Sequence, residues 1–218
     1  MLPKSNKIIY FVRHGQSIDN TLPVFQSNSS PLSRKGENQA IQIASRLDSI
    51  PFEILITSNY LRAVQTAKII ANTTKRDIEF SDLFIERKKP TSIDGKPRTD
   101  DTASATWKQW EESLYNPELH IEDGENYSDI VKRSDNALKY LTGRPEKSIV
   151  VVSHGYFIRA IIARVLLGDN LSGKTLNKIQ TVASMENTAI SVLLYNDSFE
   201  KSDRWRLWTY NDHAHFAD

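Results

Sequence analysis

The stretch from Lys7 to Asn20, KIIYFVRHGQSIDN, constrains the fold more than any other part of the chain. Ile8 to Val12 is a continuous apolar run of β-branched and aromatic residues, which predicts a strand covered on both faces. Arg13, His14 and Gly15 follow without a spacer. A permanent cation, a titratable imidazole and a residue that permits a sharp turn are therefore expected at the carboxyl end of a buried strand.

A second stretch repeats this arrangement. Ser148 to Ser153, SIVVVS, predicts another core strand, and it ends at His154 and Gly155 before the helical run YFIRAIIARVLLG. In open parallel sheets, ligands bind beyond the carboxyl ends of the strands. We therefore expect His14 and His154, although far apart in the sequence, to meet at one edge of the sheet.

Several short patterns occur in an order that resembles a known family. Arg13 to Ser17 with Asn20 resembles the RHG(E/Q)(T/S)xxN motif of the histidine phosphatase superfamily, which also contains the cofactor-dependent phosphoglycerate mutases. The likeness continues through Pro31-Leu32-Ser33 with Gly36, Ser58 to Ala67, Gly124-Glu125 with Asp129 and Arg133, and Ser153-His154-Gly155. The resemblance implies an α/β fold of three layers, α/β/α, with a mostly parallel central sheet as in the phosphoglycerate mutases.

Size and composition fit one such domain. The 218 residues are expected to form a single domain, residues 1–218, with a lid-like loop and helix insertion at about 84–122. Lys and Arg number 28 and Asp and Glu 27, for a net charge of +1, so no overall field would recruit nucleic acid or membrane. The absence of cysteine excludes disulfides and cysteine catalysis. The first apolar run is interrupted by Arg13, so this run predicts neither a signal peptide nor a membrane span. We therefore expect a cytoplasmic protein.

The residues fit phosphoryl transfer, which needs an uncharged nucleophile, cations around the phosphate oxygens and an acid for the leaving group. His14 is the expected nucleophile, and His154 is expected in the catalytic group beside it. Arg62 falls in the first turn of a helix predicted over 60–72, where backbone N–H groups favour an anion. The resemblance implies that Glu86, a few residues after Leu83 at the end of a short strand predicted over 78–83, donates the proton. The expected phosphate-binding set is Arg13, Asn20, Arg62, His154 and Gly155.

Two loops are expected to decide the substrate. Thr21 to Ser30 is polar and should pass close to His14, and residues 87–101 form a long basic loop. The candidates for substrate contact are Ser17, Gln26, Lys88 and Lys89. The loop's cations, Arg87, Lys88, Lys89, Lys96 and Arg98, indicate either a lid that accepts a second acidic group or a solvated loop. Many relatives carry a glycine soon after the acid and a later Trp-Glu-Gly, which this chain lacks, so the substrate stays open.

The remaining elements are expected to be structural. Helices are predicted after an N-cap at Ser33, over 104–115, and from a cap at Asn126 or Ser128 through Leu141, with Asp129 and Arg133 paired at i,i+4. Residues 53–58, 189–195 and 205–210 predict strands, and 169–181 a polar loop. His213-Ala214-His215 has a spacing that some metal sites use, but no carboxylate or cysteine cluster accompanies it, so an ordinary terminal segment is favoured.

The favoured function is a phosphomonoester hydrolase that forms a phosphohistidine on a small phosphorylated metabolite, without a metal ion or other cofactor. A phosphoglycerate mutase-type phosphotransferase would run the same first step, but the resemblance implies a longer insertion after the acid. A non-catalytic phospholigand-binding module is the alternative from another class, and the presence of His14 and Glu86 weighs against it. A Mg²⁺-dependent phosphatase would need clustered aspartates, whereas Asp100 and Asp101 stand alone. The expected partner is a small phosphate ester, and the sequence does not decide between a monomer and a homodimer.

Overall fold

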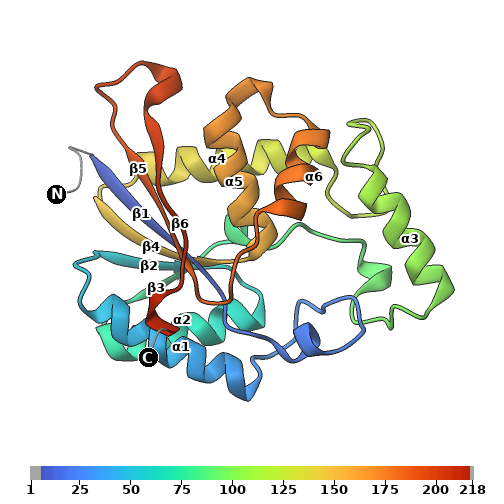
Figure 1. The fold of residues 1–218 in the computed structure, drawn as a ribbon, viewed down its shortest axis with the longest axis horizontal. Coiled ribbons are helices and arrows are strands. Elements are labelled where there is room, and N and C mark those ends of the chain that lie inside the picture. The colour runs from blue at the N-terminus through green and yellow to red at the C-terminus, as the bar shows by residue number, and fades with distance from the viewer. Residues whose placement is uncertain (1–5, 217–218) are drawn as a thin grey trace.

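The computed structural model describes residues 6–216, in which one six-stranded sheet lies between two layers of helices (Figure 1). The strand order is β3-β2-β4-β1-β5-β6. The strands are β1 (Lys7–Arg13), β2 (Ile54–Thr57), β3 (Ile78–Phe80), β4 (Ser148–Ser153), β5 (Ile190–Tyr195) and β6 (Trp205–Asp212). The first four are mutually parallel, while β5 pairs antiparallel with β1, and β6 with β5. The expectation of a mostly parallel sheet in an α/β fold is confirmed.

The helices cover both faces of this sheet (Figure 1). On one face lie α1 (Arg34–Asp48) and α2 (Leu61–Thr74), and on the other α4 (Tyr127–Gly143), α5 (Gly155–Leu167) and α6 (Gly173–Val182). A further helix, α3 (Asp101–Glu112), lies beyond the end of the sheet toward which β1 and β4 run. Short 3₁₀ helices are η1 (Ile18–Thr21), η2 (Asp82–Phe84), η3 (Thr91–Ile93), η4 (Gly168–Asn170), η5 (Lys201–Asp203) and η6 (Ala214–Phe216).

The side chains of β1 and β4 alternate between two hydrophobic cores. Ile9 and Phe11 join the core under α4 and α5, whereas Val12 joins the core under α1 and α2. All three are fully buried, and burial of such a side chain stabilises the fold by about 1.5–3 kcal/mol. In the parallel register Arg13 lies opposite Ser153. This register places His14 and His154, the residues that follow, at the same edge of the sheet.

Capping signals in the sequence set several helix starts. The Ser33 hydroxyl accepts a hydrogen bond from the Gly36 N–H at 3.1 Å, as expected for an N-cap. Asn126 caps α4 by accepting from the Asp129 N–H at 3.0 Å, and the Asp129 carboxylate accepts in return from the Asn126 N–H at 3.1 Å. The predicted pair between Asp129 and Arg133 is therefore wrong, because Asp129 is engaged in this capping box and Arg133 binds Glu125 instead.

Residues 169–181 are not the loop that was predicted. They contain η4 and most of α6, which Ser172 caps through the Thr175 N–H. A Cβ at Gly173 would lie 1.6 Å from the Leu114 carbonyl oxygen, so α6 can pack there only because its first residue is glycine. The composition of this segment is polar, so the helix was not predicted. Its buried Leu176 packs into the hydrophobic core, which is a contact with segments far away in the sequence.

The other element boundaries differ from expectation by a few residues. The predicted helix over 104–115 begins instead at Asp101, because the Asp100 carboxylate accepts from the Ala103 N–H at 2.9 Å. The predicted 78–83 strand stops at Phe80 and gives way to η2. Strands β5 and β6 lie where the alternating pattern placed them.

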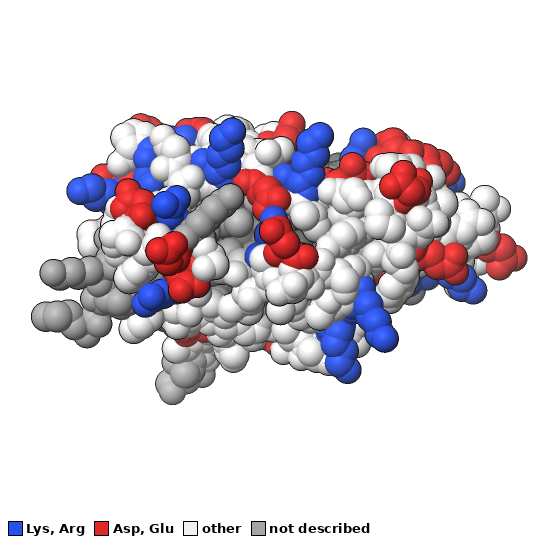
Figure 2. Space-filling model, turned by 90° about the horizontal axis from the view of Figure 1, so that it is seen from above, with Lys and Arg blue, Asp and Glu red and all other residues white. Residues whose placement is uncertain are grey.

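The described residues contain neither a candidate metal cluster nor a membrane span. Within 6–216 there is no group of three or more His, Cys, Asp or Glu residues placed to hold a metal ion. His215 instead lies 3.1 Å from the Thr188 hydroxyl and 3.3 Å from Arg46. In the same range, no helix has the length and apolar character needed to cross a bilayer. Positive and negative side chains are interspersed over the face seen in Figure 2, in line with the small net charge.

Candidate active site

His14 lies immediately after β1 and is only 2% exposed. Its backbone N–H donates to the Ser153 carbonyl at 2.9 Å, which ties it to the end of β4. Its Nδ1 lies 2.6 Å from the Gly15 carbonyl oxygen. Because a carbonyl oxygen can only accept, this contact assigns the proton to Nδ1 and leaves the lone pair on Nε2.

Arg62 faces that lone pair. It lies in the first turn of α2, is 1% exposed, and donates from Nε to His14 Nε2 at 3.0 Å. Its Nη1 donates to the Ser27 carbonyl at 2.9 Å, so the loop over 21–30 does pass beside His14 as expected. Burial lowers the pKa of Arg62 to about 10, which leaves the guanidinium charged at neutral pH.

His154 lies across from His14, with 5.0 Å between the ring centroids. Its Nε2 is 2.7 Å from the hydroxyl oxygen of Ser58, and its buried Nδ1 has no hydrogen-bond partner among residues 6–216. If the Ser58 hydroxyl donates to Nε2, the proton lies on Nδ1 and an N–H donor is left without an acceptor. The edge of the Tyr60 ring packs against His154 at 5.2 Å.

Both imidazoles are neutral at pH 7. Burial holds the pKa of His14 well below its usual range, and the charges of Arg62 and Arg13 lower it further. Burial, followed by Arg62, has the same effect on the pKa of His154. A buried ring beside guanidinium groups is more stable without a proton, so His14 keeps an available lone pair even in mildly acidic solution.

Arg13 completes the cationic wall. It donates from Nη1 to the Met185 carbonyl, while its buried Nε has no partner among the described residues. A Cβ at Gly155 would lie 3.4 Å from both Cδ and Nε of Arg13, an ordinary van der Waals distance, so the Arg13 side chain lies directly against the start of α5. The predicted phosphate-binding residues Arg13, Arg62, His154 and Gly155 are thus brought together with His14.

Glu86 reaches the same place from the segment after η2. Its carboxylate accepts from the Phe157 N–H at 3.0 Å and the Arg87 N–H at 3.1 Å, and lies 3.4 Å from the Tyr156 nitrogen. The carboxylate therefore occupies the N-terminus of α5, where unsatisfied N–H groups favour a negative charge.

Arg133 fixes the backbone on which Glu86 stands. Its guanidinium donates to the carbonyls of Leu83 at 3.1 Å, Ile85 at 2.8 Å and Glu86 at 3.2 Å. It also makes a bidentate pair with Glu125 at 2.6 and 2.7 Å. The position of the Glu86 side chain thus depends on Arg133 through three backbone carbonyls.

The loop residues divide into those that reach the cavity and those that do not. Asn20 and Gln26 line it, and Asn20 also accepts from the Ser17 N–H at 3.0 Å. Ser17 is fully buried and accepts from the Gln26 side chain, so it supports Gln26 and does not reach the cavity. Lys88 pairs with Asp123 at 3.1 Å and does not line the cavity, which removes it from the candidates for substrate contact.

The basic loop supplies few free cations. Lys89 lines the cavity but is paired with Asp94 at 2.6 Å. Arg87 is 3% exposed, stacks over Trp110 at 3.7 Å and pairs with Glu111 at 3.2 Å. Of the two alternatives for the loop cations, a lid that accepts a second acidic group and a solvated loop, Arg87 fits neither because it is buried and paired, and Lys89 is paired as well. Lys96 and Arg98 are exposed, as in a solvated loop.

The cavity between these elements has a volume of about 630 Å³. One wall comes from α3 and the loops, and the other from α5 and α6. Its lining residues are Asp19, Asn20, Leu22, Val24, Gln26, Asn28, Arg62, Glu86, Arg87, Lys89, Arg98, Trp107, Trp110, Glu111, Tyr156, Arg159, Asn177, Gln180 and Thr181. A hollow of this size holds a small metabolite.

Comparison with known proteins identifies the family. The family model of the histidine phosphatase superfamily (branch 1) matches residues 9–211. The chain belongs to this superfamily. It is 28% identical over 211 residues to the probable phosphoglycerate mutase GpmB of Escherichia coli O1:K1 / APEC, with 95% of this chain and 94% of that protein covered.

Solved structures share the histidine phosphatase fold. A mycobacterial glucosyl-3-phosphoglycerate phosphatase superposes with a TM-score of 0.73 at 22% identity, covering 94% of this chain and 99% of that one. A mutant phosphoserine phosphatase from Entamoeba histolytica, in complex with phosphoserine, gives a TM-score of 0.74 at 20% identity, with 96% and 99% covered.

Some residues of this histidine phosphatase site were not predicted. Thr66 accepts from the Gly15 N–H at 3.1 Å and donates to the Arg62 carbonyl at 2.8 Å, joining the turn after β1 to α2. Asn187, in the loop before β5, donates to the His14 carbonyl oxygen at 2.8 Å. The spacing of Thr66 four residues after Arg62 was a usable signal, whereas nothing local marked Asn187.

Proposed function

We propose that this protein is a phosphomonoester hydrolase in which Nε2 of His14 is phosphorylated. The observation that supports this most strongly is the tautomer of His14, whose Nδ1 proton is held by the Gly15 carbonyl while the Nε2 lone pair faces Arg62. An imidazole fixed in this form, uncharged and beside two guanidinium groups, is prepared to attack a phosphate dianion.

In the first step the Nε2 lone pair forms a bond to phosphorus, and the bond from phosphorus to the ester oxygen breaks. Arg62 turns its Nε–H from the imidazole to a phosphate oxygen, and Arg13, Asn20 and His154 donate to the others. Hydrogen bonds from charged donors strengthen as the oxygens gain negative charge in the transition state. Gly155 lies next to Arg13, since a Cβ at this position would be 3.4 Å from Arg13 Nε.

Glu86 serves both steps. In protonated form it gives its proton to the departing alkoxide, and as carboxylate it then takes a proton from the water that attacks phosphorus. The second step breaks the nitrogen–phosphorus bond, releases inorganic phosphate and restores neutral His14. Since Arg13 and Arg62 supply the positive charge, the proposed reaction requires no metal ion or other cofactor.

The segment over 84–122 forms one wall of the reaction site and, in this proposal, sets the substrate. Trp107 and Trp110 of α3 line the cavity, and the two rings are 4.9 Å apart. Gln26 and Lys89 face the same space from the loops. The substrate is accordingly a small phosphate ester, not a polymer.

A phosphotransferase of the mutase type is the second candidate, supported by the 28% identity to a probable phosphoglycerate mutase. It shares the phosphohistidine and differs in returning the phosphoryl group to the bound product instead of to water. The two are separated by the fate of the phosphoryl group, not by the first step.

The test uses a chromogenic ester and a labelled one. Wild-type protein should hydrolyse p-nitrophenyl phosphate and form an alkali-stable, acid-labile phosphoenzyme, and His14→Ala should do neither. With 3-phosphoglycerate, release of inorganic phosphate supports the hydrolase, whereas formation of 2-phosphoglycerate without phosphate release supports the mutase. Absence of turnover and of labelling with a panel of esters would leave only a binding module.

A further inference from the structure

Two guanidinium groups flank Gly155 at the start of α5. A Cβ at Gly155 would lie 3.4 Å from Arg13 Nε and 3.6 Å from Arg159 Nη1. Arg159 lies on the first turns of α5 and lines the same cavity as Arg62 and Glu86. The reaction proposed above uses Arg13 but gives no role to Arg159.

Arg159 is held in position by neutral groups. Its Nε donates to the Gln180 side-chain oxygen at 2.7 Å, and Gln180 in turn donates to the Tyr156 carbonyl at 3.0 Å. The Tyr210 hydroxyl lies near Arg159, whose charge partly offsets the rise that burial causes in the pKa of Tyr210. That hydroxyl is fixed because it donates toward the carbonyls of Ala183 and Ser184.

No carboxylate lies within ion-pair distance of Arg13 or Arg159 in the part of the chain from 6 to 216. The loop cations of the cavity wall behave differently: Arg87 pairs with Glu111 and Lys89 with Asp94, while Arg98 lies over the rings of Phe25 and Trp107. A half-buried guanidinium beside a second one raises the free energy of the empty site unless an anion is bound. The charge of Arg159 accordingly lowers the pKa of Arg13, in addition to the effect of burial.

The geometry points to Arg159, oriented by Gln180, as a subsite for a carboxylate on the leaving group of the substrate. This inference rests on the proposed function, and it makes the preferred substrates phosphate monoesters of small hydroxy acids. The transferred phosphate is served by Arg13 and Arg62, so Arg159 is free for the next charged group along the cavity. A single unpaired guanidinium fork matches the single charge and planar shape of a carboxylate.

The test compares 3-phosphoglycerate with glycerol 3-phosphate, which differ in a carboxylate against a hydroxymethyl group. Wild-type protein should favour 3-phosphoglycerate in kcat/KM by about 10-fold to 100-fold, the range expected for a charged hydrogen-bond pair. Arg159→Gln should bring this ratio close to one, mainly through the KM for 3-phosphoglycerate. Arg159→Lys should keep part of the ratio, because it retains the charge but loses the fork.

Two further variants control for fold and charge. Lys178→Gln removes the same charge from the exposed side of α6 and should leave the ratio as in wild type. Gln180→Leu keeps the guanidinium but removes its anchor, and should lower the ratio in the same direction as Arg159→Gln by a smaller factor. It therefore tests the subsite even where Arg159→Gln fails to fold.

Several outcomes would overturn the subsite. These are a wild-type ratio near one, an equal loss of kcat/KM for both esters in Arg159→Gln, and a stronger preference for glycerol 1,3-bisphosphate than for 3-phosphoglycerate. Formation of a phosphoenzyme on His14 with p-nitrophenyl phosphate distinguishes failure of the subsite from failure of the proposed function. Labelling without carboxylate preference removes only the subsite, whereas absence of labelling with every ester removes the proposed function together with it.

Discussion

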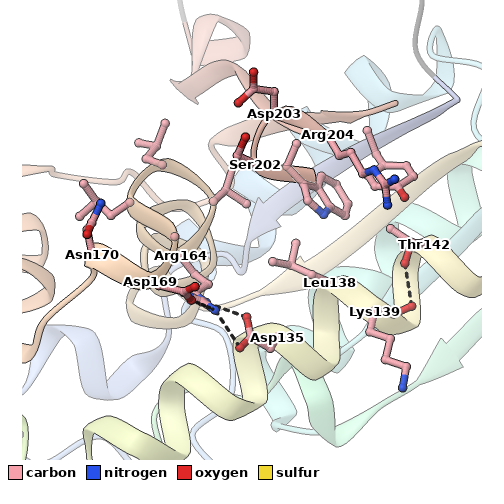
Figure 3. Close-up of a pocket in the computed structure, with 16 residues that line it drawn as sticks. Asp135, Leu138, Lys139, Thr142, Arg164, Asp169, Asn170, Ser202, Asp203 and Arg204 are labelled. Carbon is pink, nitrogen blue, oxygen red and sulfur yellow. Dashed lines mark hydrogen bonds and ion pairs between the residues drawn. The ribbon is translucent and has the colours of Figure 1, made fainter. Parts of the chain in front are cut away.

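The cavity beside His14, at the start of α5, and a larger hollow at the end of α5 differ in how their charges are compensated. The larger hollow, of about 810 Å³, lies between α4, α5 and the β5–β6 hairpin (Figure 3). There Arg164 lies between two carboxylates, at 2.7 Å from Asp135 and 2.9 Å from Asp169. Beside His14, in contrast, neither Arg13 nor Arg62 forms an ion pair within residues 6–216, and the hydrogen bonds they donate go to neutral acceptors.

The proposed active site is therefore the smaller of these two hollows, and it differs from the larger one in having arginines without ion pairs. None of the residues predicted from the sequence as catalytic or phosphate-binding lines the larger hollow. Placing two guanidinium groups away from water beside two neutral imidazoles lowers the free energy of unfolding, whereas the same groups on a solvated surface would have no such cost. Such a cost is consistent with a site that is completed by an anion.

The largest expected contrast is between removal of the nucleophile and removal of Arg164. His14→Ala should lower kcat for p-nitrophenyl phosphate by at least about 10³-fold, because the proposed phosphoenzyme forms on His14. Arg164→Met changes a charged cluster outside the cavity and should change kcat less than about twofold. Steady-state kinetics of the two variants measures this contrast. A larger loss of kcat in Arg164→Met than in His14→Ala would contradict it.

Arg62→Met should lower kcat by about 10²-fold to 10³-fold, the usual cost of removing one donor that stabilises transition-state charge. The variant also frees Nε2 of His14 from its hydrogen bond, so ground-state binding should change less than kcat does. Separate determination of kcat and KM checks this. A rise in KM alone would mean that Arg62 serves only binding.

Arg133→Lys should affect esters according to their leaving groups. A lysine cannot form hydrogen bonds with three carbonyls and Glu125 together, so Glu86 should lose its position. Hydrolysis of an ester with a poor leaving group, such as glycerol 3-phosphate, should therefore fall about 10-fold to 100-fold. p-Nitrophenolate leaves without a proton, so the loss with p-nitrophenyl phosphate should be smaller. Arg164→Lys is the matched control at a paired arginine, and equal losses with both esters in Arg133→Lys would reduce Arg133 to a stabilising role.

The last expected effect is on stability as the pH falls, and not on activity. The folded pKa values of His14 and His154 lie below the unfolded value of about 6.5, so below that pH the unfolded chain binds protons that the folded protein does not. Each histidine should then lower the free energy of unfolding by about 1.4 kcal/mol per pH unit, down to its folded pKa. Urea unfolding between pH 7 and 5 measures this slope.

His14→Gln should make that slope shallower by the share of one histidine. Arg164→Met, in the larger hollow, should keep the wild-type slope because no histidine lines that hollow. A slope that is identical in wild type and His14→Gln would mean that His14 is protonated in the folded protein.

Much of this arrangement could be read from local pattern. The apolar runs of β1 and β4 fixed two neighbouring strands, and their parallel pairing places His14 and His154 at one edge whatever the loops do. Arg62 followed from its place in the first turn of α2. These predictions succeeded because strand periodicity, chain direction and helix ends are short-range properties that a sequence carries directly.

Other features depend on contacts between distant segments. Asn187 reaches the carbonyl of His14 only because β5 runs antiparallel beside β1, and no residue near Asn187 records that pairing. The loop cations Arg87 and Lys89 have no carboxylate partner that local sequence would indicate, yet the fold pairs them with Glu111 and Asp94. Charge in a sequence fixes how many cations exist, but their partners depend on which segments pack together.

The helix α6 and the contacts of Arg159 show the same limit. A polar stretch became a helix because Gly173 allows close approach to Leu114, and that helix then placed Gln180 against Arg159. The resemblance of the ordered motifs to a known family implied the fold and the candidate nucleophile, and these motifs lie at strand ends and helix starts. The wall that would choose the substrate is assembled from α3, α5 and α6, whose mutual packing is a property of the whole folded chain.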